Sequence, residues 1–415
     1  MNGKPANKKK QQTAIAELYG EKTNNDVEDF INNSADVDEE TPKEKKTAKI
    51  KREKAERRAE TSRKAGRIVK RIILLIILAG AAGAGVWFFL QSQSSQQDMG
   101  AVEGSDTKAD EIYYSRLTGA EVNSKEAAER PATCIMIENS TAARPQSGLK
   151  DAGIIYEAVA EGGITRFMAI FQEASPQYIG PVRSVRMAYV ELAKPYHCSI
   201  AHVGGAKNAV GLIRNNSAFR DIDQFFNDSS YWRIRSRYSP HNVYTSFEKL
   251  DALNYKKGYR SSEFAGFTRV KINSEPEVPE KKANKITIQM SGPLYNPVYT
   301  YDKNTNKYLR AYQSGGAHYD MATEKGSKTQ NAPDVVIAMK VTAYARAGTK
   351  YSDYTTTGIG DAYIFQNGGV ISARWERKDK DSELRFVDTS GNDIALNRGQ
   401  TWISLYPSNG KVTWE

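Results

Sequence analysis

The stretch GIIYEAVAEGGITRFMAIF, residues 153–171, decides the fold of the central part of the chain. It holds two apolar runs of strand length, Gly153–Ala160 and Ile164–Phe171, on either side of the tight Glu161-Gly162-Gly163. Apolar runs of this length around a short glycine-bearing turn are typical of two antiparallel strands. The stretch therefore predicts a β-hairpin, and the apolar run Cys134–Ile137 predicts a further strand before it.

A change to helical spacing follows the hairpin. In VRSVRMAYVELAKPY, residues 182–196, apolar side chains recur every three or four positions, and Pro181 is suited to the first helical turn. SIAHV at 199–203 then predicts a strand, Gly204-Gly205 a turn, and AKNAVGLIRNN at 206–216 a helix with one apolar face. This order indicates a layered α/β domain, which we expect over residues 111–275. The direction of its strands stays open.

The last third of the chain has the pattern of strands. INSEPEVPEKKANK, residues 272–285, is polar and contains prolines, so we place a domain boundary there. Beyond it, short apolar runs alternate with turn residues, and Asn367-Gly368 between two such runs is a strong hairpin signal. We therefore expect an antiparallel β-rich domain over residues 286–415.

One segment near the N-terminus is apolar throughout. IILLIILAGAAGAGVWFFL, residues 72–90, has no charge and is long enough for a helix to cross a bilayer of roughly 30 Å. Between Lys43 and Arg71, fourteen Lys or Arg face four Glu, whereas neutral residues open the 91–110 segment. The sequence thus predicts a single-pass protein of the cell membrane, with a cytoplasmic N-terminus and extracytoplasmic C-terminal domains. A cleaved signal peptide is the alternative.

The expected organisation is a disordered basic cytoplasmic tail over 1–71, the transmembrane helix, a polar stalk over 91–110, and the two domains. The fold class is α+β, with a single transmembrane helix followed by a layered α/β domain and a C-terminal antiparallel β-rich domain. Partners expected for the tail are the lipid bilayer and a cytoplasmic protein. Nucleic acid is disfavoured, because no aromatic residue interleaves the basic run.

The two cysteines, Cys134 and Cys198, both lie in the outer portion of the chain. A disulfide is chemically feasible there. Both cysteines also lie in expected core strands, where a thiol packs as a small apolar group. We predict buried free thiols.

Arginines provide the candidate ligand-binding groups. Arg183 and Arg186 begin the expected helix at 182–196 on neighbouring positions of one face, and Ser184 adds a hydroxyl. With Arg144 and Arg166 they could bind a carboxylate or phosphate, because guanidinium groups bind such anions at two points. In the alternative interpretation, these arginines pair internally with acids, namely Glu138, Glu157 or Glu161.

Catalytic groups are less clearly indicated. Glu138 and Glu161 are candidates for an acid–base pair acting on a glycan, which requires a separation of roughly 5 to 10 Å that sequence does not give. His202 and His241 are candidate members of a ligand pocket. The histidines and cysteines lack metal-ligand spacing, and we expect neither a metal site nor a cofactor.

Several of these segments together resemble a known family. They are ENSTAARPQSGL at 138–149, EAVAEGGITRF at 157–167, GPVRSVR at 180–186, HVGG at 202–205, SPHNVYTS at 239–246, and RFVDTSGNDIALNRGQTWISLYP at 385–407. In these segments the sequence resembles the family of domains of unknown function numbered 3048. This family includes a YerB-like group of bacterial surface lipoproteins. The resemblance covers roughly residues 110–415 and implies a two-domain extracytoplasmic protein of the bacterial envelope. It implies no reaction.

Three functions remain in view. The first is a non-catalytic envelope protein that binds an anionic small molecule or cell-wall polymer through the four arginines. The second is an enzyme that modifies envelope glycan with Glu138 or Glu161. The third is a structural adaptor that links cytoplasmic contacts of the tail to the outside.

Overall fold

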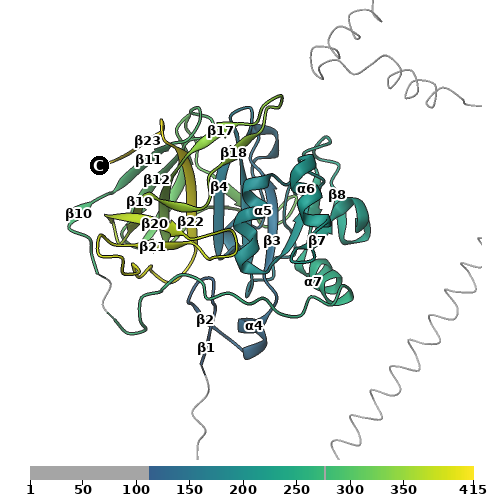
Figure 1. Cartoon of the computed structure of the whole chain (residues 1–415), viewed down its shortest axis with the longest axis horizontal. Coiled ribbons are helices and arrows are strands. Elements are labelled where there is room, and N and C mark those ends of the chain that lie inside the picture. The colour runs from purple at the N-terminus through teal and green to yellow at the C-terminus, as the bar shows by residue number, and fades with distance from the viewer. Residues whose placement is uncertain (1–111, 275–276) are drawn as a thin grey trace, which may run out of the picture. The chain divides into compact units, whose positions relative to one another are not determined.

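The computed structural model describes residues 112–274 and 277–415, and strands dominate them (Figure 1). Within these residues the α-helices are short: α4 (Lys125–Glu129), α5 (Met187–Ala193), α6 (Lys207–Arg214) and α7 (Phe247–Lys256). The described residues all belong to one compact unit.

The largest sheet of the described residues combines strands from both expected domains. It has 11 strands, in the order β10 (Lys281–Lys282), β20 (Gly369–Arg377), β19 (Gly358–Gln366), β16 (Val335–Val341), β22 (Thr401–Pro407), β4 (Ile154–Glu161), β5 (Ile164–Phe171), β3 (Thr133–Glu138), β6 (Ser199–His202) and β7 (Arg220–Asp223), and β21 (Arg385–Val387) pairs with β20. The N-terminal and C-terminal halves of this main sheet meet where β22 pairs in parallel with β4.

This sheet corrects the expected fold class. The structure is mostly β: a continuous mixed sheet forms its main body, and the helices are few and short. The α+β assignment is therefore wrong. The expected membrane span at 72–90 lies outside the described residues. Among the residues that are described, no helix has the length and apolar character needed to cross a bilayer. The expected tail and stalk also lie outside them.

The direction of the strands brings one set of ends together. β16 and β22 are parallel to β4, β3 is parallel to β6, and β6 is parallel to β7. β4 and β3 each pair antiparallel with β5, so they too run the same way. Six strands therefore end at the same margin of the sheet, which we call the carboxyl edge.

The hairpin at 153–171 is confirmed as β4 and β5. Gly162 and Gly163 both have positive φ, at 54° and 79°, which an L-residue with a side chain adopts at a cost. A register shift between Val159 and Glu161 marks a bulge just before the turn. The strand at 134–137 is confirmed as β3, and the strand and helix expected over 199–216 are β6 and α6.

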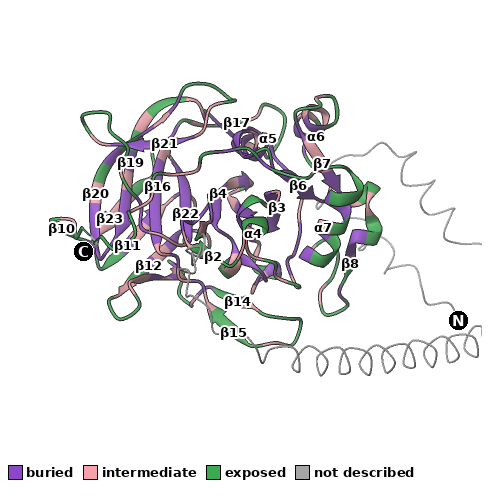
Figure 2. Cartoon of the chain, turned by 90° about the horizontal axis from the view of Figure 1, so that it is seen from below, coloured by how far each residue is buried: buried purple, intermediate pink, exposed green. Residues whose placement is uncertain are grey.

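Each face of the sheet has its own core. On β3, Cys134 and Met136 enter the core beneath α5 and α6, whereas Ile135 and Ile137 enter the core beneath α7. Such alternation follows from the twofold period of side chains along a strand. The inner strands β16, β22 and β4 are accordingly buried on both faces (Figure 2).

The helix expected from residue 182 begins later. Residues 182–186 are extended because their backbone N–H groups bond to neighbouring segments: Val182 to Val243, Arg183 to Met136, and Val185 to Gly204. The helical N-terminus is at Met187. Val182 and Val185 are buried because of this extended pairing. Their separation of three positions also matches the spacing of a helix, so the sequence pattern suggested a helix there.

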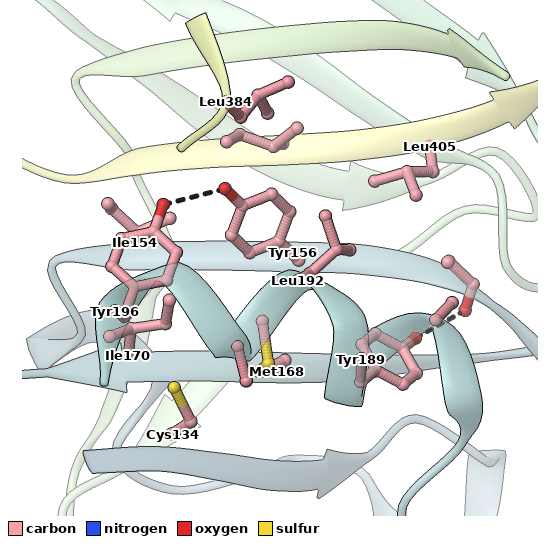
Figure 3. Packing of buried hydrophobic residues seen from close by; sticks show 14 of the residues in the cluster. Cys134, Ile154, Tyr156, Met168, Ile170, Tyr189, Leu192, Tyr196, Leu384 and Leu405 are labelled. Atoms are coloured by element: carbon pink, nitrogen blue, oxygen red, sulfur yellow. Dashed lines mark hydrogen bonds between the residues drawn. The ribbon is translucent and has the colours of Figure 1, made fainter. Parts of the chain in front are cut away.

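The prediction of free thiols is wrong. Cys134 and Cys198 form a disulfide with a Cα–Cα distance of 5.8 Å, inside the core that Figure 3 shows around Met168 and Ile170. The physical reason is the parallel pairing of β3 with β6, in which Cys134 lies opposite Ile200 and hence close to Cys198. Sequence did not indicate that pairing.

A second sheet packs against the C-terminal half of the main sheet. It is antiparallel, in the order β13 (Lys307–Tyr312), β12 (Pro297–Asp302), β11 (Lys285–Gln289) and β23 (Lys411–Trp414). Ile286 and Ile288 of β11 share a core with Val336 and Ala338 of β16. The hairpin signal at Asn367-Gly368 is confirmed as the turn between β19 and β20.

Four two-stranded sheets complete the described fold. They are β1 (Tyr113–Tyr114) with β2 (Glu121–Val122), β8 (Tyr231–Arg233) with β9 (Val243–Thr245), β14 (Tyr319–Met321) with β15 (Lys328–Gln330), and β17 (Ala343–Ala345) with β18 (Ser352–Tyr354). The β17–β18 hairpin lies over the β4–β5 turn, where Gly162 N–H donates to the Lys350 carbonyl at 3.0 Å.

Candidate functional site

The carboxyl edge gathers most of the charged candidates. Glu138 ends β3, Glu161 ends β4 and His202 ends β6. Arg166 lies near the start of β5, which begins at the same edge because β5 is antiparallel. In open sheets with parallel strands, ligands commonly bind outside the carboxyl ends. This edge is therefore the first place to look for a site.

Glu161 pairs with two arginines. It accepts from Arg166 Nη2 at 3.0 Å and from Arg186 Nη2, and both arginine side chains are buried. Burial would raise the pKa of Glu161, but the adjacent Arg166 and Arg186 hold that pKa below its ordinary value. Burial, reinforced by Arg186, lowers the pKa of Arg166 to about 10. Glu161 is thus an ionised bridge between two cations.

Glu138 holds a neighbouring set of groups. Its Oε1 lies 2.9 Å from His241 Nδ1 and accepts from the Ser140 hydroxyl at 2.9 Å. Its Oε2 lies 3.5 Å from Arg183 Nε, an ion pair without hydrogen-bond geometry. Ser184 contributes its carbonyl, which accepts from Arg166 Nη1 at 2.6 Å. We call Glu138, Glu161, Arg166, Arg183 and Arg186 the arginine cluster.

The arginine cluster has more cations than anions. Three guanidinium groups face two carboxylates, and the Nε atoms of Arg166, Arg183 and Arg186 are buried without a hydrogen-bond partner among the described residues. Such unsatisfied donors typically cost about 1–3 kcal/mol each. The internal pairing expected as the alternative is present, but it leaves an excess of positive charge.

The side chains of His202 and Arg144 make no hydrogen bond or ion pair with this cluster among the described residues. His202 is buried between the Gly204 carbonyl, 2.8 Å from Nδ1, and Asp221 Oδ1, 3.1 Å from Nε2. Arg144 donates to Asn139 and to the Leu294 carbonyl at 2.8 Å, and its guanidinium lies 3.6 Å from the centre of the Tyr312 ring. Both residues hold local structure together.

A groove adjoins the arginine cluster. Its volume is about 500 Å³, and its lining residues are Lys207, Asn208, Arg346, Thr349 and Tyr351. The Arg186 guanidinium lies 4.3 Å from the centre of the Tyr351 ring, which connects the groove to the cluster. We call it the Tyr351 groove. It lies where the N-terminus of α6 meets the β17–β18 hairpin.

Sequence reasoning missed the lining of this groove. Lys207 is exposed at the first position of α6, a helix whose N-terminus lacks a side-chain cap. Arg346 and Tyr351 belong to the hairpin of the C-terminal half, about which the sequence offered no site signal. The β-bridge between Glu161 and Tyr351 could not be inferred from residues 190 positions apart.

Glu161 does not have the environment of a general acid, and Glu138 is engaged in ion pairs. Glu161 has a lowered pKa, and Glu138 is paired with Arg183 and His241. A general acid working near neutral pH needs a raised pKa. Within residues 112–274 and 277–415, no group of three or more His, Cys, Asp or Glu could hold a metal ion.

Comparison with known proteins gives the family. The profile described as "Protein of unknown function (DUF3048) N-terminal domain" matches residues 117–260, and its C-terminal counterpart matches residues 286–403. The chain belongs to the DUF3048 family. This confirms the resemblance drawn from the sequence motifs.

Relatives of this DUF3048 protein include one from Bacillus subtilis (strain 168), named "Putative lipoprotein YerB". It is 29% identical over 321 residues, which are 77% of this chain and 92% of the relative. The crystal structure of the YerB protein from Bacillus subtilis is similar with a TM-score of 0.62 at 26% identity, covering 72% of this chain and 99% of that one. The fold of the described residues is therefore shared with YerB.

Proposed function

We propose that this chain is an extracytoplasmic protein of the bacterial envelope that binds an anionic ligand in the Tyr351 groove. The ligand class is a phosphate- or carboxylate-bearing molecule, such as a segment of wall polymer. The observation that carries the proposal is the charge of the groove. Both charged side chains of its lining, Lys207 and Arg346, are cations.

The surroundings of the groove favour an anion further. The first two residues of α6, Lys207 and Asn208, line the groove, and the N-terminus of this helix has no side-chain cap and carries the positive end of the helix dipole. Arg346 is paired with Asp353 at 2.7 Å, whereas Lys207 has no ion pair within the described residues. Behind Tyr351, the arginine cluster adds its excess positive charge.

The extracytoplasmic location has two supports. The YerB relative is named a "putative lipoprotein", and lipoproteins are attached to a membrane surface by a lipid. The Cys134–Cys198 disulfide is of the kind that persists in oxidising compartments and is rare in the cytosol.

The test of this proposal is a change of charge at Lys207. In Lys207→Glu, we expect affinity for the anion to fall by at least about tenfold, because the substitution replaces attraction by repulsion in the groove. Acidic residues are favourable in the first turn of a helix, so the fold should persist. Isothermal titration of the purified full chain with pyrophosphate, glycerol-phosphate oligomers and an oligogalacturonide would measure the affinity.

The matched control is Lys325→Glu, which makes the same change at an exposed lysine outside the groove. Equal losses in both variants would attribute binding to net charge alone, and the proposal would then be wrong. The same conclusion would follow if the unmodified chain bound none of the three probes. A preference between glycerol phosphate and galacturonide would show whether phosphate or carboxylate is recognised.

A further inference from the structure

A second groove lies at the opposite edge of the main sheet. Its volume is about 460 Å³, and its lining comes from α4, the residues after β5, and the C-terminal part of α7. Figure 1 shows α4 and α7 at the lower end of β3, away from the β17–β18 hairpin. We call it the Tyr255 groove, and no step of the proposed function depends on it.

Two tyrosines give the groove an aromatic wall. Tyr255 is 70% exposed, which is unusual for so large a ring. Its ring is braced from one side by Arg260, whose guanidinium lies 3.8 Å from the ring centre and donates to the Tyr255 carbonyl at 2.5 Å. Tyr259 is braced by Arg220 at 5.4 Å. The rings are therefore held in place while Tyr255 faces solvent.

Planar polar side chains lie beside the rings. Arg130 donates to Asp251 Oδ2 at 2.5 Å and to the carbonyls of Gln172 and Ala174 at 3.2 and 3.1 Å. These bonds fix both the guanidinium and the carboxylate. Asp251 keeps a second carboxylate oxygen, Oδ1, for which the described residues offer no hydrogen bond. Fixed polar groups of this kind can orient a ligand without losing much side-chain entropy.

Asn254 provides an unused acceptor in the lining. Its side chain is buried, and Nδ2 donates to Thr133 Oγ1 at 3.2 Å. Its Oδ1 has no hydrogen-bond partner in the part of the chain that is described. A buried carbonyl oxygen left unpaired costs about 1–3 kcal/mol. Because Oδ1 is covered in this structure, a ligand has to displace a neighbouring side chain to bring a hydroxyl or an amide N–H to it, and would then recover this free energy.

We propose that the Tyr255 groove binds a saccharide, with a sugar ring packed on Tyr255 and hydroxyl or acetamido donors directed to Asn254 and Asp251. An aromatic face beside hydrogen-bonding groups suits a molecule that is apolar on one side and polar at its edges. An anion is disfavoured, because the lining holds three acids, Glu126, Glu173 and Asp251, against two arginines.

The experiment is titration of the full chain with N,N′-diacetylchitobiose and with cellobiose, followed by saturation-transfer NMR. We expect millimolar or tighter binding of at least one of them, and a loss of about tenfold or more in Tyr255→Ala. Tyr255→Phe should retain binding, because the ring face remains. Binding of diacetylchitobiose alone would assign the acetamido donor to Asn254, whereas binding of both would assign hydroxyl donors.

The matched control is Tyr344→Ala, which removes another exposed tyrosine, 53% exposed, that does not line the groove. This variant should bind as the unmodified chain does. The proposal is overturned if neither disaccharide binds at millimolar concentration, or if Tyr255→Ala binds as tightly as Tyr344→Ala. Because both probes are uncharged, failure here leaves the Tyr351 groove untouched, and its failure leaves this proposal untouched.

Discussion

At the scale of the residue, a buried ion pair joins the main sheet to the second sheet. Glu157 of β4 and Arg310 of β13 are fully buried, and Arg310 Nη2 lies 3.0 and 2.9 Å from the two carboxylate oxygens. Burial opposes the charge on Arg310, but Glu157 raises the arginine's pKa above its ordinary value. Burial and the nearby Arg310 lower the pKa of His318, which is therefore neutral.

Substitution of Glu157 tests this pair. Glu157→Gln would leave the Arg310 charge buried without its counter-ion, and we expect a loss of about 3–5 kcal/mol in the free energy of unfolding. Urea denaturation would measure it. Glu376→Gln, which breaks the half-exposed pair with Arg374, serves as the control and should cost about 0–1 kcal/mol. Similar losses in the two variants would contradict the assigned role.

Asp320 predicts a dependence of stability on pH. Its carboxylate accepts from the Leu149 N–H at 2.6 Å, yet burial raises its pKa from 3.8 to about 7. The folded chain therefore keeps a proton that the unfolded chain releases, so this contribution to stability is complete below pH 3.8 and is lost as pH rises to about 7. Asp320→Asn should flatten the unfolding free energy across this window. An unchanged slope in urea titrations would refute the assignment.

At the scale of the element, the hairpin was predictable and the start of α5 was not. The apolar runs and glycines at 153–171 specify β4 and β5 locally. Residues 182–186, in contrast, take their conformation from partners distant in sequence: Met136, Gly204 and Val243. A pattern with a period near three could not distinguish this extended segment from a helix.

Gly205 tests how closely that segment packs. A Cβ at Gly205 would lie 2.7 Å from the Val185 carbonyl oxygen, so Gly205→Ala should push α6 from residues 182–186 and cost about 1–3 kcal/mol. Gly211, inside α6, has nothing within 4 Å of such a Cβ. Gly211→Ala should therefore stabilise by about 0.5–1 kcal/mol. Thermal unfolding of both variants would show opposite shifts, and shifts of the same sign would be inconsistent with this packing.

At the scale of the whole molecule, the sequence indicated which arginines lie close together but not the groove beside them. Arg166, Arg183 and Arg186 do meet, because β5 begins at the carboxyl edge and the extended residues 182–186 pair with the neighbouring end of β3. Arg144 does not join them. The Tyr351 groove could not be predicted, because it depends on β22 lying between β16 and β4, which brings the β17–β18 hairpin to the β4–β5 turn.

The shared sheet predicts that the N-terminal half does not fold alone. A chain of residues 112–274 would lack β22, the buried Trp402 of its core, and the Arg310 counter-ion of Glu157. We expect circular dichroism and amide NMR to show no cooperative unfolding of this fragment, whereas residues 112–415 should unfold in one transition. A cooperative transition of the short fragment would show that each half is autonomous.

The position of β22 in the main sheet also has a consequence for the order of events during biosynthesis. β4 pairs on one side with β5, which directly follows it, but its other edge pairs with β22, whose residues 401–407 are far away in sequence. Until the ribosome has made them, the nascent chain carries an apolar strand edge that is open to other chains. The main sheet thus closes only after residue 407 has been made, however early β4 and β5 have paired.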